Sequence, residues 1–187
     1  MASIPPSDPE RRLPAVIRII DRLSQIAAIG AALALALMSI NVMVDVIGRT
    51  FFRHPFAGTL ELTSYWWMPA LIVLSFGYAE YLQEHIKVTL VLDALPRRFR
   101  QIVEGTIALL GALLLLVVAY FTLMDAMHSF DIQQASNSKP PIAIWPFKFV
   151  AVAGAVLLAL QLAATAYRFF ADRLPARDTL LTEADVL

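Results

Sequence analysis

Four stretches without a charged residue dominate the hydrophobic pattern of the chain. They cover residues 23–44, 62–79, 105–124 and 149–167. Each has 18 to 22 residues, close to the ~20 that a helix needs to cross about 30 Å of hydrocarbon. Because the remaining residues could not bury four such segments in a soluble protein, we expect four transmembrane helices. The predicted spans are about 23–47, 61–82, 103–125 and 146–168.

The polar remainder predicts a simple organisation around these spans. We expect a flexible, proline-containing N-terminal tail over 1–12, a single membrane domain over 13–170, and a C-terminal tail over 171–187. A cleaved signal peptide is the alternative for the first stretch, but its apolar run exceeds the roughly 7–15 residues of a signal core. The first stretch is therefore interpreted as a retained span.

Two further segments have apolar residues at helical spacing and are expected to lie flat at the membrane surface. Residues 13–22 carry apolar positions on one face, with Arg18 and Arg22 on the other, before the chain turns into the first span. Residues 84–99 can be read as a helix or as an alternating strand. A lone strand at a bilayer exposes unpaired backbone groups, so we favour an interfacial helix ended by Pro96.

Composition supports a membrane protein and excludes several other classes. Hydrophobic residues make up 59% of the chain and charged residues 16%, with a net charge of zero. So little charge cannot cover a soluble domain, and the balanced charge gives no indication of nucleic-acid binding. The chain has no cysteine, which excludes disulfides, zinc fingers and iron–sulfur ligation. The fold class is therefore an all-α integral membrane protein.

The lysines and arginines predict the orientation of the chain. Eleven of the fifteen lie before the first span, between the second and third spans, or at and beyond the end of the fourth span. Four lie in the other two loops or at their edges. Because positive residues collect on the cytoplasmic side, both termini are expected in the cytoplasm.

Candidate chemistry within the spans is sparse, because nearly all ionisable residues lie at span ends. Asp45 and Arg49 are four apart and are expected to neutralise each other, while Glu61 suits the positive start of the second span. The three histidines are not spaced as metal or haem ligands. We expect no enzymatic activity, no cofactor and no metal site. A direct substrate or sodium site is not expected either, because membrane ion sites rest on buried charges.

Several residues within the spans are candidates for helix packing. Alanines recur every four residues in the first and fourth spans, including Ala28, Ala32, Ala36, Ala155 and Ala159. Such rows let helices approach closely, either within this chain or against another membrane subunit, and the sequence leaves both alternatives open. Asn41 and Gln161 are expected to form hydrogen bonds across helices. Pro69 is expected to kink the second span near Tyr65.

Three stretches together resemble a known family. They are GRTFFRHPFAGTLEL, the aromatic-rich second span, and EHIKVTLVLDALP after it. Over roughly residues 15–170 the chain is similar to the small (DctQ-like) membrane subunit of tripartite ATP-independent periplasmic (TRAP) transporters. It departs from the pattern of that family at Thr89 and around Glu61.

The resemblance implies a function for the chain. In this family a periplasmic binding protein delivers an organic acid to a large membrane subunit, which carries the substrate and sodium sites and moves like an elevator. The small subunit is thought to brace the scaffold of the large one in the bacterial inner membrane. A stand-alone small four-helix transporter or an assembly factor is the alternative, although a cation exporter should have a carboxylate well inside a span.

We assign candidate residues on this basis. The expected interfacial anchors, which would contact membrane lipids, are Arg18, Arg22, Arg97, Arg98 and Arg100. Candidates for docking the binding protein are Arg49, Arg53 and Lys139. Candidates for structural or subunit contacts are Asp45, Arg49, Glu61, Glu84, His85, Lys87 and the five alanines named above.

Overall fold

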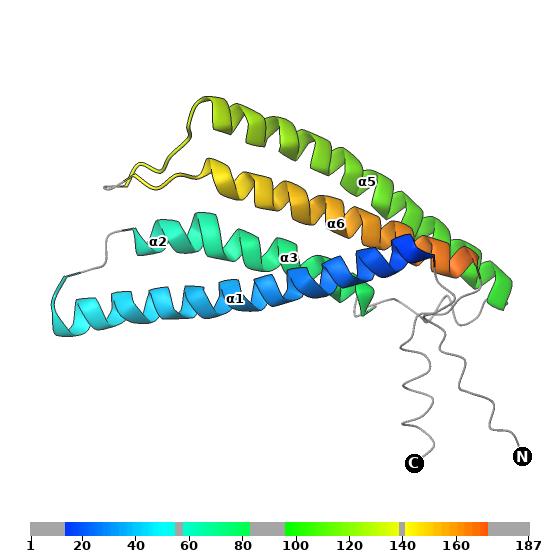
Figure 1. Ribbon diagram of the computed structural model, residues 1–187, viewed down its shortest axis with the longest axis horizontal. Helices are drawn as coiled ribbons and strands as arrows, with labels where there is room; N and C mark the ends of the chain where they lie inside the picture. Colours follow the sequence, from blue (N-terminus) through cyan, green and yellow to red (C-terminus); the bar gives the residue numbers. More distant parts are fainter. Residues whose placement is uncertain (1–13, 55–57, 83–95, 139–140, 172–187) are drawn as a thin grey trace, which may run out of the picture.

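The structure is a computed structural model that describes residues 14–54, 58–82, 96–138 and 141–171 (Figure 1). Over these ranges the secondary structure is helical, apart from one isolated β-bridge between Ala135 and Ala143. The helical elements are α1 (Ala15–Phe51), α2 (Thr59–Leu62), the π-helical turn η2 (Thr63–Trp67), α3 (Met68–Tyr81), α5 (Arg97–Asp131) and α6 (Trp145–Phe170).

The first helix, α1, is continuous over 37 residues. We expected residues 13–22 to form a separate interfacial helix that turns into the first span at residue 23. Instead, residues 15–22 are the first two turns of α1. Since no glycine or proline lies between Ala15 and Ile29, nothing in the backbone interrupts the helix there. Ile17, Ile20 and Ser24 are buried along one face that continues across the expected break.

The predicted second span consists of α2, η2 and α3 in one run. Pro69 has no N–H, so the Tyr65 carbonyl loses the bond that it would accept in an α-helix. Just before Pro69 the helix widens into a π turn, in which the Met68 N–H donates to the Thr63 carbonyl five residues back. The sequence predicted a kink near Tyr65, and the structure has a π turn at this place.

The third and fourth predicted spans are α5 and α6, and both helices begin next to a proline. Pro96 is the N-cap of α5, so Arg97, Arg98 and Phe99 form its first turn. This corrects the predicted interfacial helix over 84–99 at its C-terminal end, because a proline suits the start of a helix. The rest of that predicted helix, up to residue 95, lies outside the described residues.

The helices lie side by side in the order α5, α6, α3 and α1 (Figure 1). The most extensive packing is between α5 and α6 and between α1 and α3, and α3 joins these two pairs through α6. The start of α1 crosses α6 near its end (Figure 1). We call this end of the molecule the terminal end. The opposite end, with the α1–α2 and α5–α6 connections, is the loop end.

Within the described ranges, three helices are long and apolar enough to cross a membrane: Ala15–Phe51, Arg98–Asp131 and Trp145–Phe170. The run α2–η2–α3 is not among them, because the π turn divides it. Large apolar side chains point outward along the long helices, such as Leu114 at 66% exposure and Ile29 at 70%. An outer surface of this kind is suited to contact with lipid tails.

Small residues fill the contacts between helices. On α5 the buried apolar residues are Ala108, Ala112, Ala119 and Ala126. A side chain at Gly154 of α6 would overlap Val73 of α3, with its Cβ 2.9 Å from the Val73 carbonyl oxygen. The backbones of α3 and α6 therefore approach too closely there for any side chain.

We expect Gly154→Ala to destabilise the protein by about 1–3 kcal/mol, because the new methyl group forces α3 and α6 apart. Thermal unfolding in detergent, followed by circular dichroism, measures this effect. Gly30→Ala is the matched control, since its Cβ would lie 3.4 Å from the flexible Leu74 side chain and alanine favours the helix. Equal melting temperatures for the two variants would contradict the proposed close contact.

Candidate functional site

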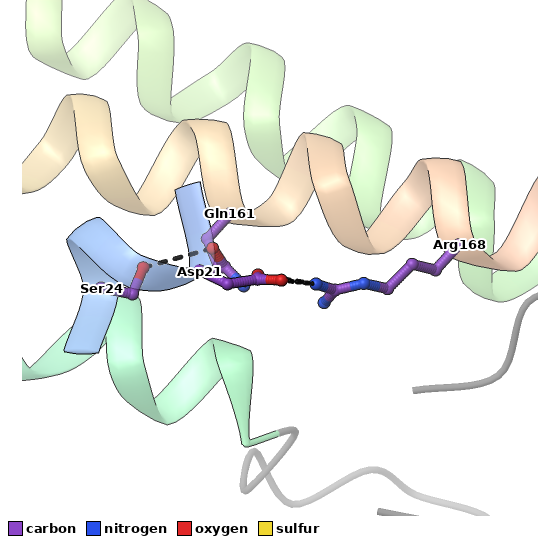
Figure 2. Close-up of polar contacts among 4 residues, drawn as sticks. All are labelled: Asp21, Ser24, Gln161 and Arg168. Carbon is purple, nitrogen blue, oxygen red and sulfur yellow. Dashed lines mark hydrogen bonds and ion pairs between the residues drawn. The ribbon is translucent and has the colours of Figure 1, made fainter. Parts of the chain in front are cut away.

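Four polar side chains join α1 to α6 near the terminal end (Figure 2). The Arg168 Nη2 lies 2.6 Å from both carboxylate oxygens of Asp21. Gln161 donates to Asp21 Oδ1 at 3.1 Å, and Ser24 donates to Gln161 Oε1 at 3.2 Å. We call these four residues the Asp21 cluster.

Helical spacing places the members of the Asp21 cluster on facing sides of the two helices. Asp21 and Ser24 are three residues apart on α1, and Gln161 and Arg168 are seven apart on α6, so each pair shares one face. The Arg168 guanidinium also lies 6.0 Å from the centre of the Tyr81 ring on α3, within reach of a cation–π contact. The cluster therefore links three helices.

The Asp21 cluster is buried, which determines its energetic role. Ser24 and Gln161 are fully buried, and Arg168 is 4% exposed. A buried charge is tolerated when an opposite charge and hydrogen bonds compensate its lost hydration, and removing one partner leaves the other uncompensated. The arrangement fixes α1 against α6. It brings no nucleophile together with a base, so it has no evident catalytic use.

A second set of contacts holds the loop end together. The Trp66 indole N–H donates to the Ala143 carbonyl at 2.8 Å, and the Trp66 ring stacks on Phe147 with centroids 4.1 Å apart. Lys148 on α6 lies 2.7 Å from Asp125 Oδ2 and donates to Ser129 Oγ at 2.6 Å, both on α5. These contacts attach the α5–α6 connection to η2, and α6 to α5.

The expected anchor residues lie at the terminal end. Arg18 and Arg22 are exposed on α1, and Arg98 is exposed on α5. Arg100 is half-buried and pairs with Glu104 on the next turn, at 3.1 Å. The side chain of Arg97 lies outside what the structure describes.

The expected docking residues lie at the loop end of α1. Asp45 and Arg49 form the ion pair that their spacing predicts, at 2.8 Å, and the Arg49 side chain stays 61% exposed. Arg53 follows the end of α1, exposed, with a φ of 52°. Glu61 is half-buried in α2. Four expected residues fall outside the described ranges: Glu84, His85, Lys87 and Lys139.

The two alanine rows have different surroundings. Ala159 is 2% exposed and Ala155 is half-buried, so this part of the row on α6 packs inside the chain, whereas Ala163 is exposed. In contrast, Ala32 and Ala36 of α1 are exposed and Ala28 is half-buried. The buried alanines of α1 are Ala31 and Ala34, on the face that continues from Ser24. The predicted row on α1 therefore does not form the internal contact.

The structure gives clear roles to several residues whose roles were not predicted from the sequence. Arg168 is one of the eleven positive residues that predict the orientation, and Asp21 lies in the segment 13–22 that was expected to be a surface helix. Gln161 was expected to bond across helices, and the structure confirms this. The helical spacing of Asp21 with Ser24, and of Gln161 with Arg168, could have indicated in the sequence that each pair shares one polar face. Among the described residues, no three His, Asp or Glu side chains are grouped to hold a metal ion.

Comparison with known families identifies the chain more closely. Residues 38–172 match the family of tripartite ATP-independent periplasmic transporters, DctQ component. The chain belongs to this family. DctQ proteins are small membrane components of TRAP transporters, so the resemblance seen in the sequence is confirmed. Together with the three long apolar helices, membership makes the chain a multi-pass membrane protein and a transporter component.

The chain is also similar to a small permease protein of a TRAP transporter. The chain is similar to the ectoine TRAP transporter small permease protein TeaB of Halomonas elongata, with 29% identity over 123 residues. The similar region covers 64% of this chain and 62% of the relative, so it spans less than two thirds of the relative's length. No solved structure matches the chain.

We expect Asp21→Leu to destabilise the protein by about 3 kcal/mol or more, because it leaves the Arg168 charge buried without a counter-charge. Thermal unfolding in detergent measures the loss. The double change Asp21→Leu with Arg168→Met removes both charges and should recover most of it. Arg18→Met, at an exposed position on the same helix, is the control. A double variant as unstable as Asp21→Leu would argue against the buried pair.

Proposed function

We propose that this chain is the non-catalytic small membrane subunit of a sodium-coupled TRAP transporter that takes up an organic acid. The observation that carries the proposal is the DctQ family match over residues 38–172. In this proposal the substrate and sodium sites lie on a large membrane subunit, and a periplasmic binding protein delivers the substrate. The chain itself transports nothing.

The charge distribution of the described helices supports a subunit without its own ion site. The buried Arg168 is paired with the partly buried Asp21, and Asp45 and Glu104 pair with arginines on their own helices. The buried Glu80 also takes part in an interaction. An ion carrier needs a charged side chain free to bind and release its cargo, and these side chains are engaged in structural contacts.

We infer a topology of four spans with both termini in the cytoplasm of a bacterial cell, across the inner membrane. The run Thr59–Tyr81 lies beside α1 and α6, and its 23 residues extend about 34 Å at ~1.5 Å per residue, enough to cross the hydrocarbon. Among the lysines and arginines in the described ranges, most lie at the terminal end, which supports its cytoplasmic position.

We propose that the chain acts as a brace for the scaffold of the large subunit. Its helices form a broad array in which α5 and α1 lie at opposite edges (Figure 1). Such an array can extend a scaffold sideways in the membrane. Arg18, Arg22 and Arg98, exposed at the terminal end, are positioned to hold lipid headgroups and so to resist changes of depth and tilt.

The stand-alone four-helix transporter and the assembly factor remain as alternative functions. Reconstitution separates them from the brace. In vesicles, we expect the chain alone to give no uptake, and the chain with its large subunit and binding protein to give sodium-dependent uptake. Omission of the chain should abolish or strongly reduce this uptake. Sodium-linked flux through the chain alone would contradict the proposal, as would full uptake without it.

We further propose that Arg49 and Arg53, together with Lys139, help to dock the binding protein through an acidic patch on that protein. We expect the triple change to alanine to raise the binding-protein concentration needed for half-maximal uptake, and to reduce the salt dependence of uptake. The charge-conserving change of Arg49 and Arg53 to lysine, with Lys139 to arginine, is the matched control and should leave the concentration dependence unchanged. An unchanged concentration dependence in the triple variant would rule out the docking role.

A further inference from the structure

Three buried polar side-chain atoms in the described part of the chain have no hydrogen-bond partner, and two of the three belong to the π turn. These two are Thr63 Oγ1 and Trp67 Nε1 of η2, and the third is Asn41 Oδ1 of α1, a helix that packs against η2. Buried polar atoms without partners raise the free energy of the conformation that contains them, above all in a lipid environment. The π turn is therefore a costly local conformation.

Two features hold the helix in this costly conformation. Pro69 disfavours a regular α-helix because its ring crowds the carbonyl four residues before it. Trp66, inside the π turn, is fixed by its hydrogen bond to Ala143 and its stacking on Phe147. The orientation of Trp66 depends on the π turn, and the α5–α6 connection holds Trp66 in that orientation.

We propose that η2 is a register switch, which stays π-helical while Trp66 is bonded to the α5–α6 connection and becomes α-helical when that bond is released. A π turn contains one residue more than the α turn that it replaces. Its loss rotates α2 relative to α3 by one residue step, about 100° on an α-helix of ~3.6 residues per turn. Gly58, whose φ of 92° suits glycine, lies before α2 and can absorb the rotation.

The rotation has a defined consequence for the residues of α2. With α3 fixed, Leu60 moves into the place that Thr59 now occupies, and Glu61 moves into the place of Leu60. Thr59 is 7% exposed and Leu60 is 74% exposed. The switch therefore buries Leu60 and brings the carboxylate of Glu61 to the surface of the loop end. Release of the Trp66 bond at the α5–α6 connection therefore exposes the negative charge of Glu61.

Cysteine labelling can detect this exchange, because the chain has no native cysteine. Thr59→Cys, Leu60→Cys and Glu61→Cys are made one at a time in the full chain, and their rates of reaction with a maleimide are measured in detergent. In the otherwise unchanged chain, we expect Leu60→Cys to react fastest and Thr59→Cys slowest.

The same three cysteines are then placed in a chain with Trp66→Phe and Pro69→Ala, which removes the hydrogen bond and allows an α-helix. We expect the rate of Leu60→Cys to fall to that of Thr59→Cys in the unchanged chain, and the rate of Glu61→Cys to rise to the earlier rate of Leu60→Cys. Phe52→Cys, 76% exposed just after α1, is the control and should not change.

An unchanged order of rates, with normal circular dichroism and an unchanged Phe52→Cys rate, would overturn the proposal. If the double change unfolds the chain, all three cysteines react fast and the helical signal falls. Trp66→Phe alone then decides, because it releases the hydrogen bond to Ala143 and leaves Pro69 in place. We expect the same exchange of rates there, and an unchanged order would overturn the register switch.

Discussion

The ion pair between Asp21 and Arg168 determines how the two halves of this protein are joined. The α1–α3 pair and the α5–α6 pair are each held by the packing of neighbouring helices, and between the pairs α3 packs on α6. Small residues let neighbouring helices approach closely, and the polar contacts between α1 and α6 add a constraint on their register. Arg168 Nη2 contacts both carboxylate oxygens of Asp21, and two further hydrogen bonds pass through Gln161, so these side chains favour one register of α1 on α6.

The amino-acid sequence predicts the helical architecture well, because uncharged runs of the right length have few other uses. The apolar segments that form α1, α5 and α6 can be predicted from the sequence alone. The same holds for the ion pair of Asp45 with Arg49 and for an irregular helical turn before Pro69. These features depend on neighbours in sequence, so spacing along one helix is sufficient to predict them.

The features that sequence failed to predict depend on pairing between distant segments. The Asp21 cluster joins residues 147 positions apart, and periodicity within one helix cannot indicate which face meets which. The alanines of α1 show the same limit. Two rows of small residues run along that helix, and the row buried in the structure contains Ala31 and Ala34 rather than Ala32 and Ala36. Only the position of the neighbouring helix decides which of the two rows is buried. Similarly, the first turns of α1 are amphipathic, which predicted a surface helix. In the structure their apolar face packs against α6 instead of lying on the membrane.

The unbroken course of α1 has a mechanical consequence. Its 37 residues amount to about 55 Å of helix, well beyond the thickness of the hydrocarbon, and no hinge interrupts the backbone between Ala15 and Phe51. An unbroken helix of this length can act as a lever with its fulcrum in the bilayer. A sideways push at one end of such a lever moves the other end in the opposite direction, so α1 offers a mechanical connection between the two ends of the molecule.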